Sequence, residues 1–261
     1  MKLVRVERSD RVARLVLCRA RMQNALVPEL LDEMLAALAA IAVDPGCAVL
    51  ILAAEGQAFS IGGDMRRFRR EAAGDVKAYS AELVGRLNAT ILALIDLPQP
   101  VIAEVSGIVT GGSLGLVLAC DLVYLAPQVA FKAHYASVGF APDGGWTALL
   151  PRLAGVHRSA AAILLNRTLG AEEAVAWGLA NEVVAAAGLQ EKVSSVARRV
   201  AASPTGTMRA AKRLVWGDRT QLAAALEAER QHFIALIDQP QTLAGIEAFL
   251  TTFSDYPDST D

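Results

Sequence analysis

The sequence predicts an α/β fold, because apolar strands alternate with glycine-rich turns and helices along its first two thirds. The clearest unit spans residues 101–126, where an apolar strand leads through a Gly111-Gly112 pair into a second apolar segment. Two more glycine-rich turns follow strands, at residues 55–64 and 137–145. A hydrophobic fraction of 54% with 20% charged residues in 261 positions is enough for a sizeable packed core.

The turn at Gly111-Gly112 favours a site for an anion or for an oxygen that gains negative charge. Glycine lets the backbone approach a ligand closely, and the first N–H groups of a helix, which we expect to begin near Gly112, lack partners within it. Nucleotide motifs do not fit, because there is no G-x-G-x-x-G and no P-loop lysine between Gly107 and Ser113. The alternative is structural: the glycine pair only lets a strand and a helix pack closely.

Composition excludes several classes of function. A net charge of −2 and a pI near 6.0 give no electrostatic footprint for nucleic acid. The three cysteines, Cys18, Cys47 and Cys120, are not in CxxC spacing, so we expect neither a disulfide framework nor a zinc site. The first residues lack the apolar core of a signal peptide, and the uncharged run 105–120 is shorter than a membrane span. We therefore expect a cytoplasmic protein with no nucleic-acid or membrane partner.

The first hundred residues predict a hairpin, a helix, a strand and a long helix. Period-two alternation supports the hairpin strands, and apolar residues at helical spacing after Val27 support the first helix. Pro98 and Pro100 end the long helix before the central strand. The arginine-rich stretch 65–70 is expected to be a mobile segment or to face a ligand phosphate. The elements are, in order, strands 3–6 and 12–17, a helix from residue 27, strand 48–53 and helix 79–97.

The second half predicts short strands and then an almost wholly helical tail. Strands are expected at 121–125, 129–131 and 179–184, and helices at 147–153, 159–165 and 172–177. From residue 189 the pattern is helical, with breaks at Pro204 and Pro240. We divide the chain into a core, residues 1–200, and a C-terminal helical region, residues 201–261. Apolar faces of this tail either fold back on the core or meet other subunits; they include Leu222, Leu226, Phe233 and Leu236.

Six motifs, in one order along the chain, resemble a known family. Residues 56–64, GQAFSIGGD, are similar to the first oxyanion loop of the crotonase, or enoyl-CoA hydratase/isomerase, superfamily, and residues 102–121 are similar to its second. The other matching stretches are residues 24–26, 139–145, 177–184 and 203–212. The resemblance extends from about Val4 to Phe249, nearly the whole chain.

The resemblance implies a crotonase-like spiral of repeated ββα units with C-terminal helices that assemble a homotrimer or a dimer of trimers. It implies an acyl-CoA thioester as substrate and no metal or redox cofactor. Two backbone N–H groups of the family hold the thioester oxygen, and here they fall on Ile61 and Gly112. Contacts to substrate and coenzyme A are expected from the residues around these turns: Ala25, Ser60, Gly62, Gly63, Asp64, Gly111 and Tyr135.

The expected catalytic acids depart from the hydratase pattern. A hydratase of this family uses two glutamates, and their positions fall here on Gly115 and Tyr135. Ordinary hydration of a 2-enoyl-CoA is therefore not expected. One carboxylate remains, Asp143 in a Pro-Asp-Gly-Gly stretch that resembles the acid of the single-aspartate isomerases, such as ring-1,2-epoxyphenylacetyl-CoA isomerases. The alternative is that Asp143 is an ordinary turn residue.

Other residues keep two interpretations each. His134 and Tyr135 either bind substrate or close a pocket, and Glu104 is either a second acid or an edge residue of its strand. His157 is expected at the surface. Arginines of the loops either pair with coenzyme A phosphates or are solvated; they are Arg19, Arg66 and Arg67.

The leading function is therefore an enoyl-CoA isomerase. A family dehalogenase uses a nucleophilic aspartate near this position, but its supporting histidine has no counterpart that we locate here. Water addition with an atypical acid such as Glu104 is the favoured enzymatic alternative. The non-enzyme alternative is a homologue that binds acyl-CoA without catalysis. The sequence leaves the acyl group, the pathway and the choice between trimer and hexamer open.

Overall fold

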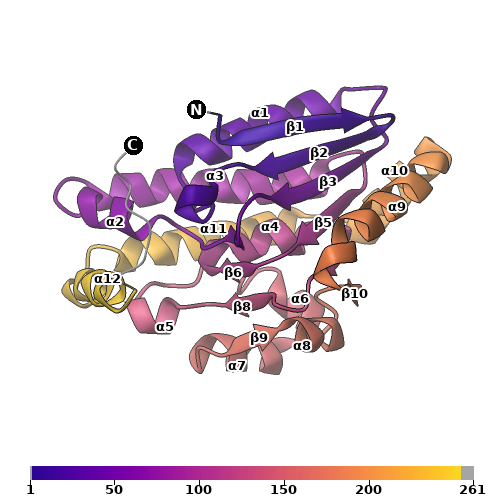
Figure 1. The fold of residues 1–261 in the computed structure, drawn as a ribbon. Helices are drawn as coiled ribbons and strands as arrows, with labels where there is room; N and C mark the ends of the chain where they lie inside the picture. Colours follow the sequence, from indigo (N-terminus) through magenta and orange to yellow (C-terminus); the bar gives the residue numbers. More distant parts are fainter. Residues whose placement is uncertain (1, 254–261) are drawn as a thin grey trace.

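The chain forms two β-sheets and passes alternately from one to the other as it winds in a spiral (Figure 1). The structure is a computed structural model, and it describes residues 2–253. The larger sheet contains, in spatial order, β1 (Val4–Ser9), β2 (Val12–Leu17), β3 (Val49–Ala54), β5 (Val101–Val105), β7 (Leu122–Leu125) and β10 (Glu182–Val183). The smaller sheet contains β4 (Ala58–Ser60), β6 (Ile108–Thr110), β8 (Ala130–Lys132) and β9 (Thr168–Gly170).

Each repeat of the chain gives one strand to each sheet. β3 is followed by β4, β5 by β6 and β7 by β8, and the strands within each of these two sets run parallel. β1 joins the larger sheet as the antiparallel arm of the N-terminal hairpin, and β9 joins the smaller sheet antiparallel to β8. The predicted ββα spiral is therefore confirmed, and the loops after β4 and β6 emerge next to each other.

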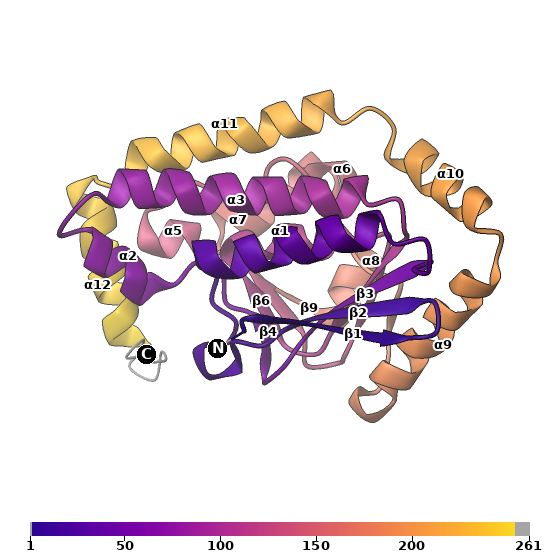
Figure 2. The same ribbon diagram turned by 90° about the horizontal axis from the view of Figure 1, so that it is seen from above.

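Helices cover the sheets and close one end of the molecule. Figure 2 shows α1, α3 and α11 lying alongside one another as a layer, while α9 packs on the larger sheet. The helices are α1 (Pro28–Ala42), α2 (Met65–Glu71), α3 (Val76–Asp96), α4 (Leu114–Leu118), α5 (Tyr135–Val138), α6 (Leu150–Ala154), α7 (Val156–Leu164), α8 (Ala171–Ala176), α9 (Leu189–Ala202), α10 (Thr205–Trp216), α11 (Thr220–Leu236) and α12 (Pro240–Thr252). α12 packs against α2 and α5.

The long elements agree with the sequence, and so do the short elements β7, β8 and α8, whereas other short elements do not. The hairpin, α1, α3, the central strand β5 and the breaks at Pro204 and Pro240 lie where they are predicted. The predicted loop at 55–64 contains β4, and the tight turn after β5 contains β6, because three-residue strands give no readable alternation. The stretch 65–70 forms most of α2, which Asp64 begins by accepting a hydrogen bond from the Arg67 N–H (3.1 Å); whether it is mobile or faces a ligand phosphate stays a prediction.

Two turns also differ from expectation. The turn cluster at 137–145 begins with the short helix α5, and the helix expected near Gly112 starts as a single 3₁₀ turn, Gly111–Ser113, followed by the five residues of α4. A helix this short adds little dipole, so any anion-holding role of the turn rests on its individual N–H groups.

The C-terminal helices form part of the core. On α11 the apolar residues Leu222, Leu226 and Phe233 are buried, so this face folds back on the core, in contact with α3. The division into residues 1–200 and 201–261 stays a prediction, and residues 254–261 lie outside the described part. No helix among the described residues has the length and apolarity to cross a membrane.

Candidate active site

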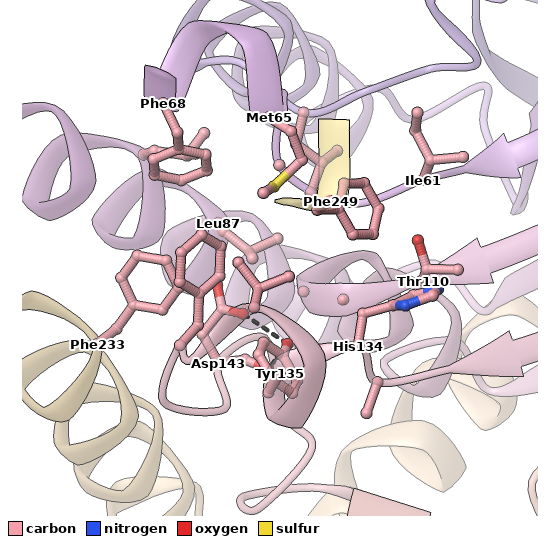
Figure 3. Close-up of a pocket in the computed structure, with 18 residues that line it drawn as sticks. Ile61, Met65, Phe68, Leu87, Thr110, His134, Tyr135, Asp143, Phe233 and Phe249 are labelled. Carbon is pink, nitrogen blue, oxygen red and sulfur yellow. Dashed lines mark hydrogen bonds between the residues drawn. The ribbon is translucent and has the colours of Figure 1, made fainter. Parts of the chain in front are cut away.

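A pocket lies where both glycine turns meet α3, α5, α11 and α12. Most of its lining is apolar, and Figure 3 shows Met65, Phe68, Leu87, Phe233 and Phe249 around it. Phenyl rings from α2 and α11 approach to 5.9 Å between centroids, so part of the wall is aromatic. Such a lining suits the apolar part of an acyl group.

Asp143 supplies the carboxylate of this pocket. Its side chain is 7% exposed, and the Tyr135 hydroxyl donates a 2.6 Å hydrogen bond to its Oδ1 (Figure 3). On the other side, a Cβ added to Gly112 would lie only 2.9 Å from Oδ2, so the carboxylate rests directly against the second glycine turn. The structure thus brings together three of the predicted site residues, Asp143, Gly112 and Tyr135.

Burial shifts the titration of this carboxyl group. Loss of solvent raises the pKa of Asp143 from 3.8 to about 7, the Tyr135 hydrogen bond opposes the rise, and the nearby Glu229 carboxylate adds to it. Burial also raises the pKa of Tyr135, so its hydroxyl keeps its proton and acts as a donor. A carboxyl group with a pKa near 7 can both take and return a proton near neutral pH.

The loop of Asp143 is fixed to the glycine turn. Trp146 Nε1 donates a 2.7 Å hydrogen bond to the carbonyl oxygen of Gly111. Gly144 has a φ of +58°, and a Cβ on it would lie closer than 3.0 Å to the carbonyl oxygen and Cα of Gly112. Only glycine fits this approach, which explains the Gly in the Pro-Asp-Gly-Gly stretch.

Glu229 of α11 is a buried residue of this region that sequence analysis missed. Its carboxylate accepts hydrogen bonds from the backbone N–H groups of Gly145, Thr147 and Ala148, at 2.7–2.9 Å. The sequence holds a signal for it, because Glu229 falls in the apolar register of α11 together with Leu222, Leu226 and Phe233. A carboxylate on the buried face of an amphipathic helix needs partners.

The first glycine turn faces the same pocket. Ile61 and Gly63 line it, and the Ile61 N–H donates a long 3.3 Å hydrogen bond to the carbonyl oxygen of Gln23. A Cβ on Gly62 would lie 2.7 Å from the carbonyl oxygen of Thr110, so the two turns touch. Ile61 and Gly112 therefore line one cavity, as a two-donor oxyanion site requires, although the Ile61 N–H is bonded to Gln23; the oxyanion role itself stays a prediction.

Several residues expected to bind coenzyme A have structural partners instead of pocket-facing positions. Asp64 is fully buried and pairs with Arg19 at 2.9 Å, and Arg19 also bonds to the carbonyl oxygen of Ala25. Ser60 Oγ donates to the carbonyl oxygen of Asn24 at 2.7 Å. The predicted ligand contacts stay predictions, and the contacts present here shape the first turn.

The second carboxylate is absent from the described pocket lining, and the structure gives the reason at one of its positions. A Cβ on Gly115 would lie 2.5 Å from Ile91 Cδ1 and closer still to the carbonyl oxygen of Gly144, so no glutamate fits there. Glu104 forms an ion pair with Arg14 within the larger sheet and does not line the pocket. The interpretation of Glu104 as a second acid of this pocket is therefore wrong; Glu104 lies near the end of β5, an interior strand of the larger sheet.

The remaining candidates divide between pocket and surface. His134 lines the pocket with a φ of +63° and its ring meets Phe249 edge-on at 5.5 Å. Burial lowers its pKa to about 4, so the imidazole is neutral near pH 7. His157 is exposed, as expected, and Arg67 pairs with Glu71 at 2.7 Å.

Comparison with known proteins identifies the family. Residues 7–256 match the enoyl-CoA hydratase/isomerase family. The chain belongs to this family. A solved enoyl-CoA hydratase from Bacillus halodurans superposes with a TM-score of 0.88 at 25% identity, over 95% of this chain and 100% of that one.

Relatives of this enoyl-CoA hydratase/isomerase family member carry out different reactions. 4-Chlorobenzoyl coenzyme A dehalogenase-2 of Arthrobacter sp is 34% identical over 91% of this chain and 86% of its own length. 1,2-Epoxyphenylacetyl-CoA isomerase of Escherichia coli is 29% identical, with 92% of each chain covered. Membership thus establishes the fold and the family, while the reaction has to be argued from the site.

Proposed function

We propose that this protein is an isomerase that moves a proton along an enoyl-CoA, with Asp143 as the single acid and base. The observation that carries the proposal is that Asp143 is the one carboxylate among the described residues that line the pocket. Moving a proton between two carbons needs one group that takes it and returns it, whereas the usual activation of water in this family needs two carboxylates.

The proposed reaction begins with the thioester oxygen between the N–H groups of Ile61 and Gly112. This contact acidifies the α and γ carbons of the acyl chain, and the Asp143 carboxylate removes a proton from one of them. The electron pair spreads onto the thioester oxygen to give a dienolate, and Asp143 returns the proton to the other carbon. Fixed donors aimed at a developing negative charge need no reorganisation; losing one such donor costs about 3–4 kcal/mol of barrier.

The test is a panel of acyl-CoA thioesters incubated with the protein in D₂O and followed by mass spectrometry. We expect a 3-enoyl-CoA or a ring-epoxide CoA to change its double-bond position and to gain deuterium at carbon. Binding of several thioesters without isomerisation or deuterium uptake would instead favour the non-enzymatic alternative. Hydrolysis or hydration as the main reaction would contradict the proposal.

The pH profile is expected to fall on the acid side. Activity needs the ionised carboxylate, and the pKa of Asp143 lies near 7, so turnover should decline as the pH is lowered through about 7. An unshifted carboxylate would keep full activity down to about pH 5. Initial rates between pH 5 and pH 9, with stability controls at each pH, measure this limb.

Hydration of crotonyl-CoA is expected to be very slow or absent. Gly115 has no room for a side chain, and the Tyr135 hydroxyl is bonded to Asp143. Loss of the absorbance of the conjugated thioester measures the reaction. Turnover at about 10 s⁻¹ or more, an ordinary enzyme rate, would contradict the assignment of a one-carboxylate site.

A hydrolytic dehalogenase is the second candidate. It is favoured by the 34% identity to a 4-chlorobenzoyl coenzyme A dehalogenase and by the aromatic wall of the pocket. In that case Asp143 would attack an aryl carbon, chloride would leave, and water would hydrolyse the resulting ester. Chloride release from 4-chlorobenzoyl-CoA, with ¹⁸O from labelled water entering Asp143 over many turnovers, would establish it and replace the isomerase proposal.

We also propose a homotrimer or a dimer of trimers. Large apolar side chains stay exposed on two helical regions, including Leu214 (81%) and Val215 (84%) on α10, and Val156 (71%) on α7. Exposed apolar surface of this kind marks contact with another chain. Sedimentation velocity should show a trimer or hexamer, and Leu214→Glu with Val215→Glu should weaken it. A stable wild-type monomer at micromolar concentration would contradict this assembly.

A further inference from the structure

Glu229 lies outside the pocket lining but contacts the loop that carries Asp143. Its Oε1 accepts from the Thr147 and Ala148 N–H groups at 2.7 and 2.9 Å and from the Thr147 hydroxyl at 2.7 Å. Its Oε2 accepts from the Gly145 N–H at 2.8 Å. Four donors converge on one carboxylate that is only 4% exposed.

The helix behind Glu229 is itself held in place. Asn88 Nδ2 of α3 donates to the carbonyl oxygen of Leu226 at 2.9 Å, and Arg230 donates to the carbonyl oxygen of Ala81 at 3.2 Å. These two contacts lie one turn before Glu229 and directly after it. The carboxylate is therefore presented to the Asp143 loop from a fixed position on α11.

We infer that Glu229 is a positioning residue for the proton transfer: it holds residues 145–148, which follow Asp143 in its loop, and places a second negative charge near Asp143. This inference rests on the proposed function, because it concerns the same carboxylate. Without these bonds three backbone N–H groups would lose their acceptor, two of them in the buried residues Gly145 and Ala148, and the loop would rearrange to satisfy them. A displacement of about 1 Å at a reacting group can cost about 100-fold in rate.

The negative charge of Glu229 raises the pKa of Asp143, as burial does. Two titratable groups act on Asp143: Tyr135 of α5 donates a hydrogen bond to it, and the Glu229 carboxylate of α11 acts through its charge. The pocket around Asp143 also contains His134, together with Leu87 of α3 and Gly112 of the second turn. The nearby carboxylate disfavours a second negative charge and raises the pKa of Asp143, whereas the Tyr135 hydrogen bond lowers it. Removing the charge should therefore lower that pKa.

Glu229→Gln tests both parts of the inference. The Gln amide can keep its oxygen on the Thr147 and Ala148 donors, but its NH₂ group then faces the Gly145 N–H, donor against donor. With ¹³C-carboxyl-labelled aspartate, NMR reads the titration of Asp143 without any assay of activity, and Asp143→Asn assigns its resonance. Glu227→Gln is the matched control, because Glu227 lies on the same helix but at the surface.

We expect Glu229→Gln to lower the Asp143 midpoint by about half a unit or more and to reduce kcat about 10-fold or more, with KM little changed. Glu227→Gln should alter neither. An Asp143 midpoint that stays unchanged in folded Glu229→Gln protein, or an unchanged kcat, overturns the inference. If Glu229→Gln does not fold, Thr147→Val decides: a kcat several-fold lower supports the positioning role, and an unchanged kcat contradicts it.

The two proposals fail in different ways. If Asp143→Asn keeps full isomerase activity, the proposed function is wrong, whatever Glu229 does. If Asp143→Asn is inactive but Glu229→Gln leaves both the NMR midpoint and kcat unchanged, the function stands and the role of Glu229 is rejected.

Discussion

Asp143→Asn should lower turnover of a 3-enoyl-CoA by about 100-fold or more while acyl-CoA affinity stays within a few-fold of wild type. Asparagine keeps the shape of the side chain and can still receive the Tyr135 hydrogen bond, but it cannot take a proton, and removal of a general base typically costs that much. In the proposed site, binding rests on the glycine turns and the apolar wall, and asparagine has nearly the same size as aspartate, so it should leave both in place. Steady-state kinetics together with calorimetric titration of an acyl-CoA separate the two effects.

The stability of the same variant gives an independent check. The pKa of Asp143 is higher in the folded protein than its usual value of 3.8, so between about pH 4 and pH 7 the folded state holds more protons than the unfolded state. The free energy of unfolding therefore loses this contribution as the pH rises toward 7. Asn does not titrate, so the Asp143→Asn variant does not lose this stability. Between pH 5 and pH 8 its melting temperature should therefore rise relative to that of wild type.

A surface substitution of the same kind serves as the control. Asp32 forms an exposed ion pair with Arg86, so Asp32→Asn should leave turnover and its pH profile unchanged. If Asp143→Asn retains the isomerase activity of wild type, Asp143 is only a turn residue. The pocket would then need another base, and Glu104 does not supply it because it pairs with Arg14 inside the sheet.

The sequence predicted those parts of the fold that carry long periodic patterns. α1 and α3 repeat apolar residues at helical spacing, and β5 is buried except for the half-buried Glu104, so each is readable on its own. The tail after Pro204 was readable as helical, but the break at residues 217–219 that separates α10 from α11 was not predicted. β4, β6 and β9 have three residues each and exist because neighbouring strands pair with them. Pairing between distant segments leaves no local pattern, so these strands could not be predicted.

The site residues also divide into those that a local sequence pattern reveals and those that only long-range folding brings into place. The glycine turns and Asp143 stand in recognisable short motifs, so the resemblance found them. Glu229 is 86 positions after Asp143 and reaches its loop only because α11 folds back across α3. Glu104 misled for the opposite reason, since a carboxylate close in sequence to the second turn is held away from it by the pleat of β5.

Gly144→Ala is expected to have the second large effect, on stability and on activity together. The methyl group would lie closer than 3.0 Å to the backbone of Gly112, and Gly144 already has a φ of +58°. Strained φ costs about 1–3 kcal/mol, and overpacking a rigid contact typically adds about 1–3 kcal/mol more. We expect the free energy of unfolding to fall by the sum of these terms, as measured by urea denaturation.

Gly155→Ala separates the contact from the strain. Gly155 has a φ of +84° and a ψ of 159°, a region that glycine alone adopts readily, but a Cβ there would meet nothing within 4 Å. Gly155→Ala should therefore show the cost of strain alone and keep wild-type kcat. Gly144→Ala should lose more stability and also lower kcat, because relief of the clash must move either Asp143 or the N–H of Gly112. Equal losses in the two variants, with kcat unchanged in both, would mean that the Asp143 loop and the second glycine turn move independently, and the rigid coupling argued here would be wrong.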